Sequence, residues 1–173
     1  MEVEIKAKCG ETKFEEIKNK IVELGGTKEK DKRQIDQYYN LPHEDLRGTK
    51  RYVRVRQEGE GAILAFHENI NAGLTNEYET KVEDNKMLET ILAKFGLTKL
   101  GLIDKYREKF KLNEFEICLD RVKDIGTFVE IETDGDESNC DIKRQECIDL
   151  LNTLGLNESD LTNEFLCDIA TKP

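Results

Sequence analysis

The stretch Glu2-Val3-Glu4-Ile5-Lys6 places charged and apolar residues in strict alternation at the start of the chain. Because a β-strand turns successive side chains to opposite faces, a strand here would carry only charges on one face and only β-branched residues on the other. One such strand would mean little by itself. The pattern matters because it returns in strand after strand.

The same alternation recurs in later segments, where charged residues occupy every second position and apolar residues lie between them. The recurring charged residues are Arg54 and Arg56; Glu77, Glu79 and Lys81; Lys105, Arg107 and Lys109; Glu116 and Asp120; and Glu130 and Glu132. A sheet with one solvated face explains any single strand. Same-sign pairs repel each other mildly unless opposite charges face them, so the whole pattern favours a closed sheet.

Residue spacing predicts about eight short strands and four amphipathic helices. The strands cover residues 2–8, 34–40, 51–57, 62–68, 76–83, 104–111, 114–120 and 127–134, and the helices cover about residues 11–25, 84–96 and 141–155 and a terminal segment with Leu161, Phe165, Leu166 and Ile169. Short connections at residues 58–61 and 112–113 favour antiparallel hairpins, whereas the charge run at residues 28–33 is typical of a solvated connection.

The helices indicate which way the charged faces point. Their apolar stripes need the apolar faces of the strands, so the helices would cover those faces from outside. We therefore predict an α+β fold, namely an eight-stranded antiparallel β-barrel tunnel with a charged lumen and with helices packed on the outside. The length of 173 residues suits one domain over residues 1–173.

Composition limits the classes of partner. The net charge of −10 argues against a nucleic-acid polymer or an anionic membrane, because the long-range field repels phosphate. No apolar run approaches the roughly 20 residues of a membrane span, and the charged start is unlike a signal peptide, so a cytoplasmic location is expected.

The five cysteines, Cys9, Cys118, Cys140, Cys147 and Cys167, are odd in number and form no Cys-x-x-Cys pair, which favours reduced structural thiols.

A charged lumen needs water or a ligand. Burial of so many ions in a dry interior would cost several kcal/mol for each ion, and a water-filled tunnel with a charged ligand would relieve that cost. Basic residues suit a polyanion, whereas carboxylate pairs suit divalent cations. The combination predicts that the tunnel binds a metal-bound polyphosphate.

An ordered set of motifs over residues 2 to about 134 resembles the CYTH proteins, which include class IV adenylyl cyclases and thiamine triphosphatases and are also called triphosphate tunnel metalloenzymes. The motifs are Glu2-x-Glu4-x-Lys6, Gln34-Ile35-Asp36-Gln37-Tyr38, Tyr52-Val53-Arg54-Val55-Arg56, Glu77-x-Glu79, Lys105-x-Arg107, Asp120 and Gly126-x-Phe128-Val129-Glu130-Ile131-Glu132. The length and layout are most similar to compact, cyclase-like archaeal and bacterial members.

The resemblance implies a tunnel that binds a triphosphate together with Mg2+ or Mn2+. It implies phosphate contacts from Lys6, Arg54, Arg56, Lys105 and Arg107, metal-side carboxylates at Glu2, Glu4, Glu130 and Glu132, and supporting roles for Glu77, Glu79, Lys81 and Asp120. Lys6 or Glu4 would assist in activating the nucleophile. Arginine offers paired donors to phosphate, and hard divalent cations prefer oxygen ligands, so the residue types agree with these roles.

Two positions depart from the family pattern. His67 stands where the family usually has lysine, so the phosphate contact expected there would be weaker, pH-dependent or absent. The alternative for His67 is a surface histidine at the end of a strand. In the last helix, Glu164-Phe165 replaces the frequent Ser-Tyr pair, which leaves the closure of the tunnel and any base-binding role of that helix open.

Four functions remain open at this point. The first is an adenylyl cyclase that converts ATP to cyclic AMP and pyrophosphate; the second is a triphosphatase that releases orthophosphate from tripolyphosphate, thiamine triphosphate or a nucleoside triphosphate. The third is a non-catalytic protein that binds polyphosphate or nucleotide. The fourth is a charged interaction module, which would leave Arg54 and Lys105 exposed. A monomer and a homodimer are equally compatible with the sequence.

Overall fold

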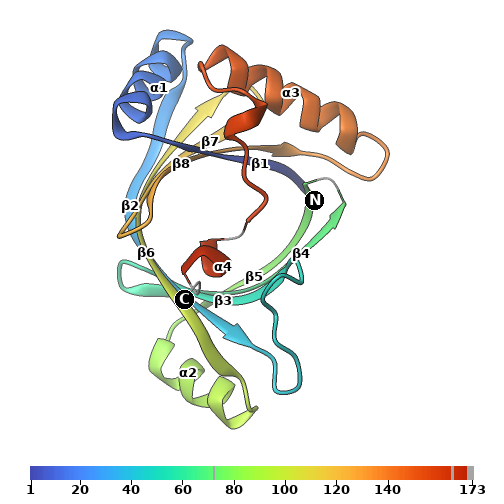
Figure 1. Cartoon of the computed structure of the whole chain (residues 1–173). Helices are drawn as coiled ribbons and strands as arrows, with labels where there is room; N and C mark the ends of the chain where they lie inside the picture. Colours follow the sequence, from blue (N-terminus) through green and yellow to red (C-terminus); the bar gives the residue numbers. More distant parts are fainter. Residues whose placement is uncertain (72, 165, 171–173) are drawn as a thin grey trace. The chain divides into compact units, whose positions relative to one another are not determined.

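The computed structural model describes residues 1–71, 73–164 and 166–170 and shows a closed barrel of antiparallel strands (Figure 1). The strands are β1 (Glu2–Cys9), β2 (Thr27–Asn40), β3 (Arg51–Glu58), β4 (Gly61–Asn71), β5 (Leu74–Val82), β6 (Thr98–Leu112), β7 (Phe115–Val122) and β8 (Gly126–Asp134). Their order around the barrel is β1-β5-β4-β3-β2-β6-β7-β8, and the pairing of β8 with β1 closes it. The predicted eight-stranded antiparallel barrel is confirmed.

The helices are α1 (Glu11–Glu23), α2 (Asn85–Lys94), α3 (Cys140–Thr153) and α4 (Leu166–Ala170), with a 3-10 turn at Glu158–Asp160. One predicted feature of the terminal segment is wrong, and another is not tested. Leu161 does not belong to the last helix, because it forms an isolated bridge with Ala7 of β1. Phe165, with the expectation attached to it, and the side chain of Cys167 lie outside the described residues.

The chain divides into two compact units. Unit 1 comprises Met1–Lys32, Ile70–Thr75 and Tyr106–Asn163, and unit 2 comprises Arg33–Asn69, Asn76–Lys105 and Glu164–Pro173. The single domain over residues 1–173 stays a prediction. Within the described ranges, no helix has the length and apolar character that a membrane crossing requires.

In unit 1, α1 and α3 cover the apolar face of β1, β7 and β8 (Figure 1). Helix α1 presents Phe14, Ile17 and Ile21 at helical spacing, and all three are fully buried. The strands contribute alternate residues such as Ile5 and Ile131 to the same core. The charged residues between them therefore lie on the opposite face of these strands, as the alternation predicts.

In unit 2, β3 and β4 form the predicted hairpin. Glu58 pairs with Gly61, and Gly59 at the turn has φ +63, a left-handed conformation that glycine adopts without steric cost. The apolar residues Val53 and Val55 of β3 share a core with Leu92 of α2. The charged residues of β3 consequently lie on its other face.

Two strands, β2 and β6, begin earlier than the sequence predicts. The charge run at residues 28–33 is the first half of β2 rather than a loop, and all six of its residues are exposed. A strand that is wet on both faces has no apolar residue at alternate positions, so period-two patterning cannot detect it. β6 also begins earlier, at Thr98 rather than at residue 104 as predicted.

Candidate functional site

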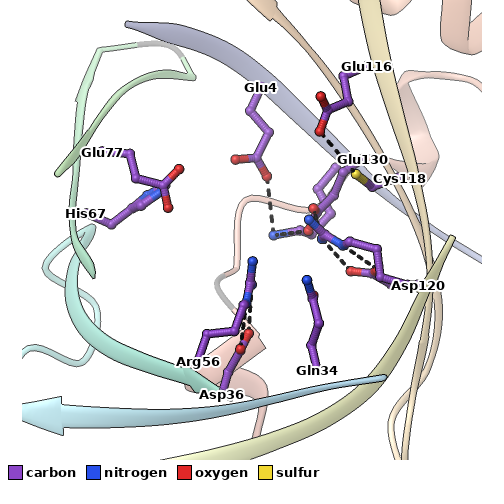
Figure 2. Close-up of polar contacts among 12 residues, drawn as sticks. Glu4, Gln34, Asp36, Arg56, His67, Glu77, Glu116, Cys118, Asp120 and Glu130 are labelled. Atoms are coloured by element: carbon purple, nitrogen blue, oxygen red, sulfur yellow. Dashed lines mark hydrogen bonds and ion pairs between the residues drawn. The ribbon is translucent and has the colours of Figure 1, made fainter. Parts of the chain in front are cut away.

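Unit 1 gathers charged side chains on the strand face opposite its helices. We call this set the carboxylate cluster; it comprises Glu4, Lys6, Arg107, Lys109, Glu116, Cys118, Asp120, Glu130 and Glu132. Figure 2 labels five of these residues, namely Glu4, Glu116, Cys118, Asp120 and Glu130. Strand register produces the grouping, because Glu132 pairs with Glu4 on one side and with Glu116 on the other. Carboxyl groups outnumber ammonium and guanidinium groups in this cluster.

Arg107 and Lys6 neutralise one side of the carboxylate cluster. Arg107 donates to both oxygens of Asp120, at 2.7 and 2.6 Å, and also pairs with Glu130. The Lys6 ammonium lies 3.1 Å from Glu130 and 3.5 Å from Glu4. Although burial opposes it, the charges of Asp120 and Glu130 raise the pKa of Arg107 well above its ordinary value. Glu130 is therefore held by two cations.

Glu132 has a different environment. Burial raises its pKa well above the ordinary value, and the hydrogen bond with Glu116 and the negative charge of Glu4 raise it further. Burial acts in the same direction on Glu116, but its hydrogen bond with Glu132 and the Lys109 ammonium lower the pKa of Glu116 overall. A protonated Glu132 that donates to an ionised Glu116 fits both shifts. This side of the cluster thus has negative charge to offer a cation.

Unit 2 gathers a second set of charged side chains, which we call the arginine cluster. It comprises Asp36, Arg54, Arg56, His67, Glu77, Glu79 and Lys105. Arg56 donates to both oxygens of Asp36, at 2.8 and 2.9 Å, and the two residues pair in register between β2 and β3. Burial alone would raise the pKa of Asp36, but Arg56 and the charges of Arg54 and Lys105 hold it well below the ordinary range.

Arg54 is a deeply buried cation of the arginine cluster. Its Nη2 donates to Glu77 at 2.9 Å and to Glu79 at 2.8 Å, and its side chain is 6% exposed. Its Nε is also buried and has no hydrogen-bond acceptor within the described part of the chain. A buried donor without an acceptor is costly, so this atom is suited to a ligand oxygen.

His67 is also buried, so the alternative of a surface histidine is wrong. Its Nε2 lies 2.9 Å from Glu77, and its ring stacks on Tyr52 with centroids 4.6 Å apart. Burial acts to raise the pKa of Glu77, but His67 and Arg54 lower it to about 2. Aromatic stacking and a carboxylate hold the imidazole that stands in the place of the expected lysine.

Other predicted residues are distributed unevenly. Arg54 and Lys105 are both buried, which contradicts the exposed charged module. Glu2 and Lys81 are exposed and belong to neither cluster. The alternation of charged residues does not include Cys118, although it occupies the same strand face as Glu116 and Asp120. The signal for Cys118 in the sequence is its position, midway between these two charged residues at period two.

The carboxylate cluster contains a group of possible metal ligands. One ligand atom each from Glu116, Cys118 and Glu132 lies within 4.8 Å of the other two. The two carboxylates match the oxygen donors that Mg2+ and Mn2+ prefer, and their excess negative charge suits a divalent cation. The two carboxylates therefore fit the metal that the sequence resemblance implies.

The fold and the two clusters define the class of this protein: it is a closed antiparallel β-barrel with paired charges on the strand face opposite its helices. Comparison with known families assigns the chain within it: the chain belongs to the CYTH domain family, whose model matches residues 1–166. This match extends the resemblance beyond the barrel strands to the start of α4.

Individual relatives support the assignment. A protein of Methanocaldococcus jannaschii named "Putative adenylate cyclase" is 30% identical, and the alignment covers 98% of each chain. The solved structure of the PH1012 protein from Pyrococcus horikoshii has a TM-score of 0.85 at 27% identity and covers 97% of this chain and 98% of its own. A Hippeastrum protein described as a putative adenylyl cyclase with a dominant triphosphatase activity shares the fold, with a TM-score of 0.62, 15% identity and coverage of 90% and 89%.

Proposed function

We propose that this protein is a divalent-metal-dependent enzyme that cleaves a triphosphate. Of the candidate reactions, we favour the conversion of ATP to cyclic AMP and pyrophosphate. Membership of the CYTH family supports the class, and the name of the Methanocaldococcus relative supports the cyclase. The observation that carries the proposal is the buried Arg54, whose guanidinium retains an unused donor. A phosphate oxygen is the natural acceptor for that donor.

Each cluster has residue types that suit the chemical groups of a metal–triphosphate complex. In the arginine cluster, Arg54, Arg56, Lys105 and His67 would bind phosphate oxygens, with Glu77 and Glu79 holding Arg54 in position. In the carboxylate cluster, Lys6 and Arg107 would bind phosphate, while Asp120 orients Arg107. A bound Mg2+ or Mn2+ would be held on the side of Glu4, Glu130 and Glu132, where it would neutralise charge on the phosphate oxygens. Glu2 lies on the same face of β1 as Glu4 and would add a carboxylate on the metal side. Lys81 would have a supporting role.

The reaction depends on which nucleophile is aligned. A cyclase directs the 3'-oxygen of ribose at the α-phosphorus and releases pyrophosphate, whereas a triphosphatase directs water at the terminal phosphorus. Both reactions place added negative charge on phosphate oxygens, which Lys6 and the arginines would stabilise. Lys6 and Glu4, 3.5 Å apart, are the residues proposed to assist in activating the nucleophile.

Triphosphatase activity is the alternative, because the Hippeastrum protein joins a cyclase name to a dominant triphosphatase activity on this fold. Purified protein is incubated with ATP, tripolyphosphate and thiamine triphosphate in the presence of Mg2+ or Mn2+. Cyclic AMP and pyrophosphate in equal amounts support the cyclase. Orthophosphate without a cyclic product supports the triphosphatase and excludes the cyclase. Intact substrates after prolonged incubation exclude both, and tight binding in that case identifies a non-catalytic polyphosphate-binding protein.

Replacement of Arg54 by Ala tests the residue that carries the proposal. The variant should bind tripolyphosphate at least about tenfold more weakly by calorimetry, because a buried charge-assisted donor is lost. Arg47→Ala is the matched control, since Arg47 is an exposed arginine that also pairs with a carboxylate, Asp45. Circular dichroism first establishes that both variants are folded. Unchanged binding in a folded Arg54→Ala variant would remove Arg54 from the binding site.

A further inference from the structure

The carboxylate cluster contains a ligand type that Mg2+ does not use. Cys118 lies between Glu116 and Asp120 on the charged face of β7, and in register opposite Glu130 of β8. Its thiol is fully buried, and its sulfur contacts Glu116 at 3.9 Å (Figure 2). A buried thiol normally lies among apolar side chains, whereas this one lies beside carboxyl groups.

The surroundings of Cys118 favour a cation. Glu116 and Glu132 each place a carboxylate oxygen within 4.8 Å of its sulfur. Among the described residues, Glu132 makes no ion pair with a lysine or arginine, in contrast to Glu130, which has two. Glu116 shares one cation, Lys109. The three ligand atoms therefore include one carboxylate, that of Glu132, for which the described residues provide no ion pair.

Thiolate ligands discriminate between divalent metals. Mg2+ binds oxygen and keeps several waters, whereas Zn2+ and Co2+ accept sulfur readily and are often held by three protein ligands with one position left open. Glu116, Cys118 and Glu132 provide three such ligands, two oxygens and one sulfur. The open position would take water or a phosphate oxygen of the ligand.

We infer that Glu116, Cys118 and Glu132 form a mixed oxygen and sulfur metal centre, and that Cys118 gives this protein a preference for thiophilic divalent cations such as Zn2+ and Co2+ over Mg2+. On binding, the sulfur–hydrogen bond of Cys118 is replaced by a sulfur–metal bond, and the proton leaves to solvent. No electron transfer is involved in this exchange. The inference deepens the proposed function and rests on it for the role of the metal in turnover.

Cobalt spectroscopy tests the sulfur ligand directly. Metal-free protein is titrated with Co2+ alone, and the ultraviolet absorption is recorded. A sulfur-to-cobalt charge-transfer band should appear in the wild type and be absent in Cys118→Ser. Cys9→Ser is the matched control, because Cys9 is a half-buried cysteine at the end of β1 that contacts Thr127 and no carboxylate ligand; it should retain the band.

Calorimetry supplies a second measurement that does not depend on activity. Cys118→Ser should weaken Zn2+ binding at least about tenfold and leave Mg2+ binding within a small factor, whereas Cys9→Ser should change neither. Thermal unfolding of each metal-free variant shows whether it is folded. A wild-type protein that binds Co2+ without the charge-transfer band, or a folded Cys118→Ser variant with unchanged Zn2+ affinity, overturns the inference.

The outcomes separate this inference from the proposed function. A charge-transfer band in a protein that cleaves no triphosphate supports the mixed metal centre and overturns the enzymatic proposal. Turnover with Mg2+ in a protein that shows no band supports the enzyme and overturns the mixed centre. Metal-dependent turnover that shifts from Zn2+ or Co2+ towards Mg2+ in Cys118→Ser supports both.

Discussion

At the residue scale, two of the Asp–Arg pairs have similar geometry in opposite environments. Asp36 and Arg56 are buried and joined by two hydrogen bonds, whereas Asp45 and Arg47 are exposed and joined by similar contacts. A buried ion pair that loses one partner leaves the other charge uncompensated, whereas an exposed pair is screened by water. The two pairs therefore form a natural comparison.

Asp36→Asn should lower the free energy of unfolding by about 3–5 kcal/mol at neutral pH, because the Arg56 charge stays buried without its carboxylate. The loss is measured by urea denaturation. Asp45→Asn should cause little change. A small effect of Asp36→Asn, equal to that of the exposed control, would show that Arg56 is readily resolvated.

The same pair predicts a pH dependence with a definite sign. The pKa of Asp36 is depressed in the folded protein, so its stabilising contribution is present above the unfolded pKa of about 3.9 and is lost as the pH falls towards the folded value. The difference in stability between wild type and Asp36→Asn should therefore be largest at neutral pH and shrink below about pH 4. A difference that is constant down to acid pH contradicts the ionised pair.

Glu132 has the opposite shift and predicts the opposite effect. Because its pKa is raised, the metal-free folded protein loses stability as the pH rises through that value. Glu132→Gln removes this cost, so the melting temperature in EDTA should rise by about 2–4 °C at neutral pH, as for a gain of about 1 kcal/mol in a chain of this size. The gain should vanish below about pH 4, where the unfolded carboxyl is also protonated.

Glu60→Gln provides the control for Glu132→Gln, because Glu60 is an exposed carboxylate in the β3–β4 turn. This control should leave the melting temperature unchanged. A destabilised Glu132→Gln variant in EDTA would mean that the carboxylate, rather than the acid, is the form that the fold requires.

At the element scale, the sequence predicts the strands well where one face is apolar. β1, β3 and β8 lie within one or two residues of their predicted limits because apolar and charged residues alternate along them. β2 is longer than predicted because residues 28–33 have no apolar face. Sequence patterning therefore finds a strand through its packing, and a fully solvated strand leaves no such signal.

In unit 1, a close backbone contact between Gly73 and Glu4 holds the start of β1. Residue patterning does not predict this contact. Gly73 has φ +96, its carbonyl accepts a hydrogen bond from the Glu4 amide at 3.1 Å, and an added Cβ would lie 2.6 Å from the Glu4 carbonyl oxygen. The chain can approach Glu4 this closely only because residue 73 has no side chain. The strand that carries Glu4 and Lys6 depends on this glycine for its position.

Gly73→Ala should therefore reduce the free energy of unfolding by about 1–3 kcal/mol, through both the unfavourable φ and the clash with Glu4. Gly61→Ala is the matched control, since its added Cβ would lie 3.9 Å from the nearest atom. The control should change stability by less than about 1 kcal/mol in either direction. Equal melting curves for the two variants would show that this contact relaxes without cost.

At the scale of the whole molecule, the sequence predicts a closed barrel but not the pairing of individual charges. The alternation shows that Lys6, Arg107 and Glu130 share a strand face, yet only the register of β1 with β8 shows that Lys6 lies beside Glu130. Register between strands so distant in the chain is set by the packing of the core, which local patterning does not encode. The sequence predicts most of the charged residues of the arginine cluster and the carboxylate cluster. It does not predict that the Nε of Arg54 lacks an acceptor among the described residues, or that the sulfur of Cys118 lies within 4.8 Å of oxygens of Glu116 and Glu132.

A ligand that binds only the folded barrel should stabilise the whole molecule. Tripolyphosphate with Mg2+, at a concentration about 100-fold above its Kd, should add about 2.7 kcal/mol to the free energy of unfolding. For a chain of this size, that corresponds to a rise in melting temperature of roughly 5–10 °C. Sodium sulfate at the same ionic strength controls for general anion effects and should give a much smaller shift, and Arg54→Ala should lose most of the shift seen with tripolyphosphate. Equal shifts with sulfate and tripolyphosphate, or a full shift in Arg54→Ala, would mean that the polyanion binds the surface rather than the buried arginine cluster.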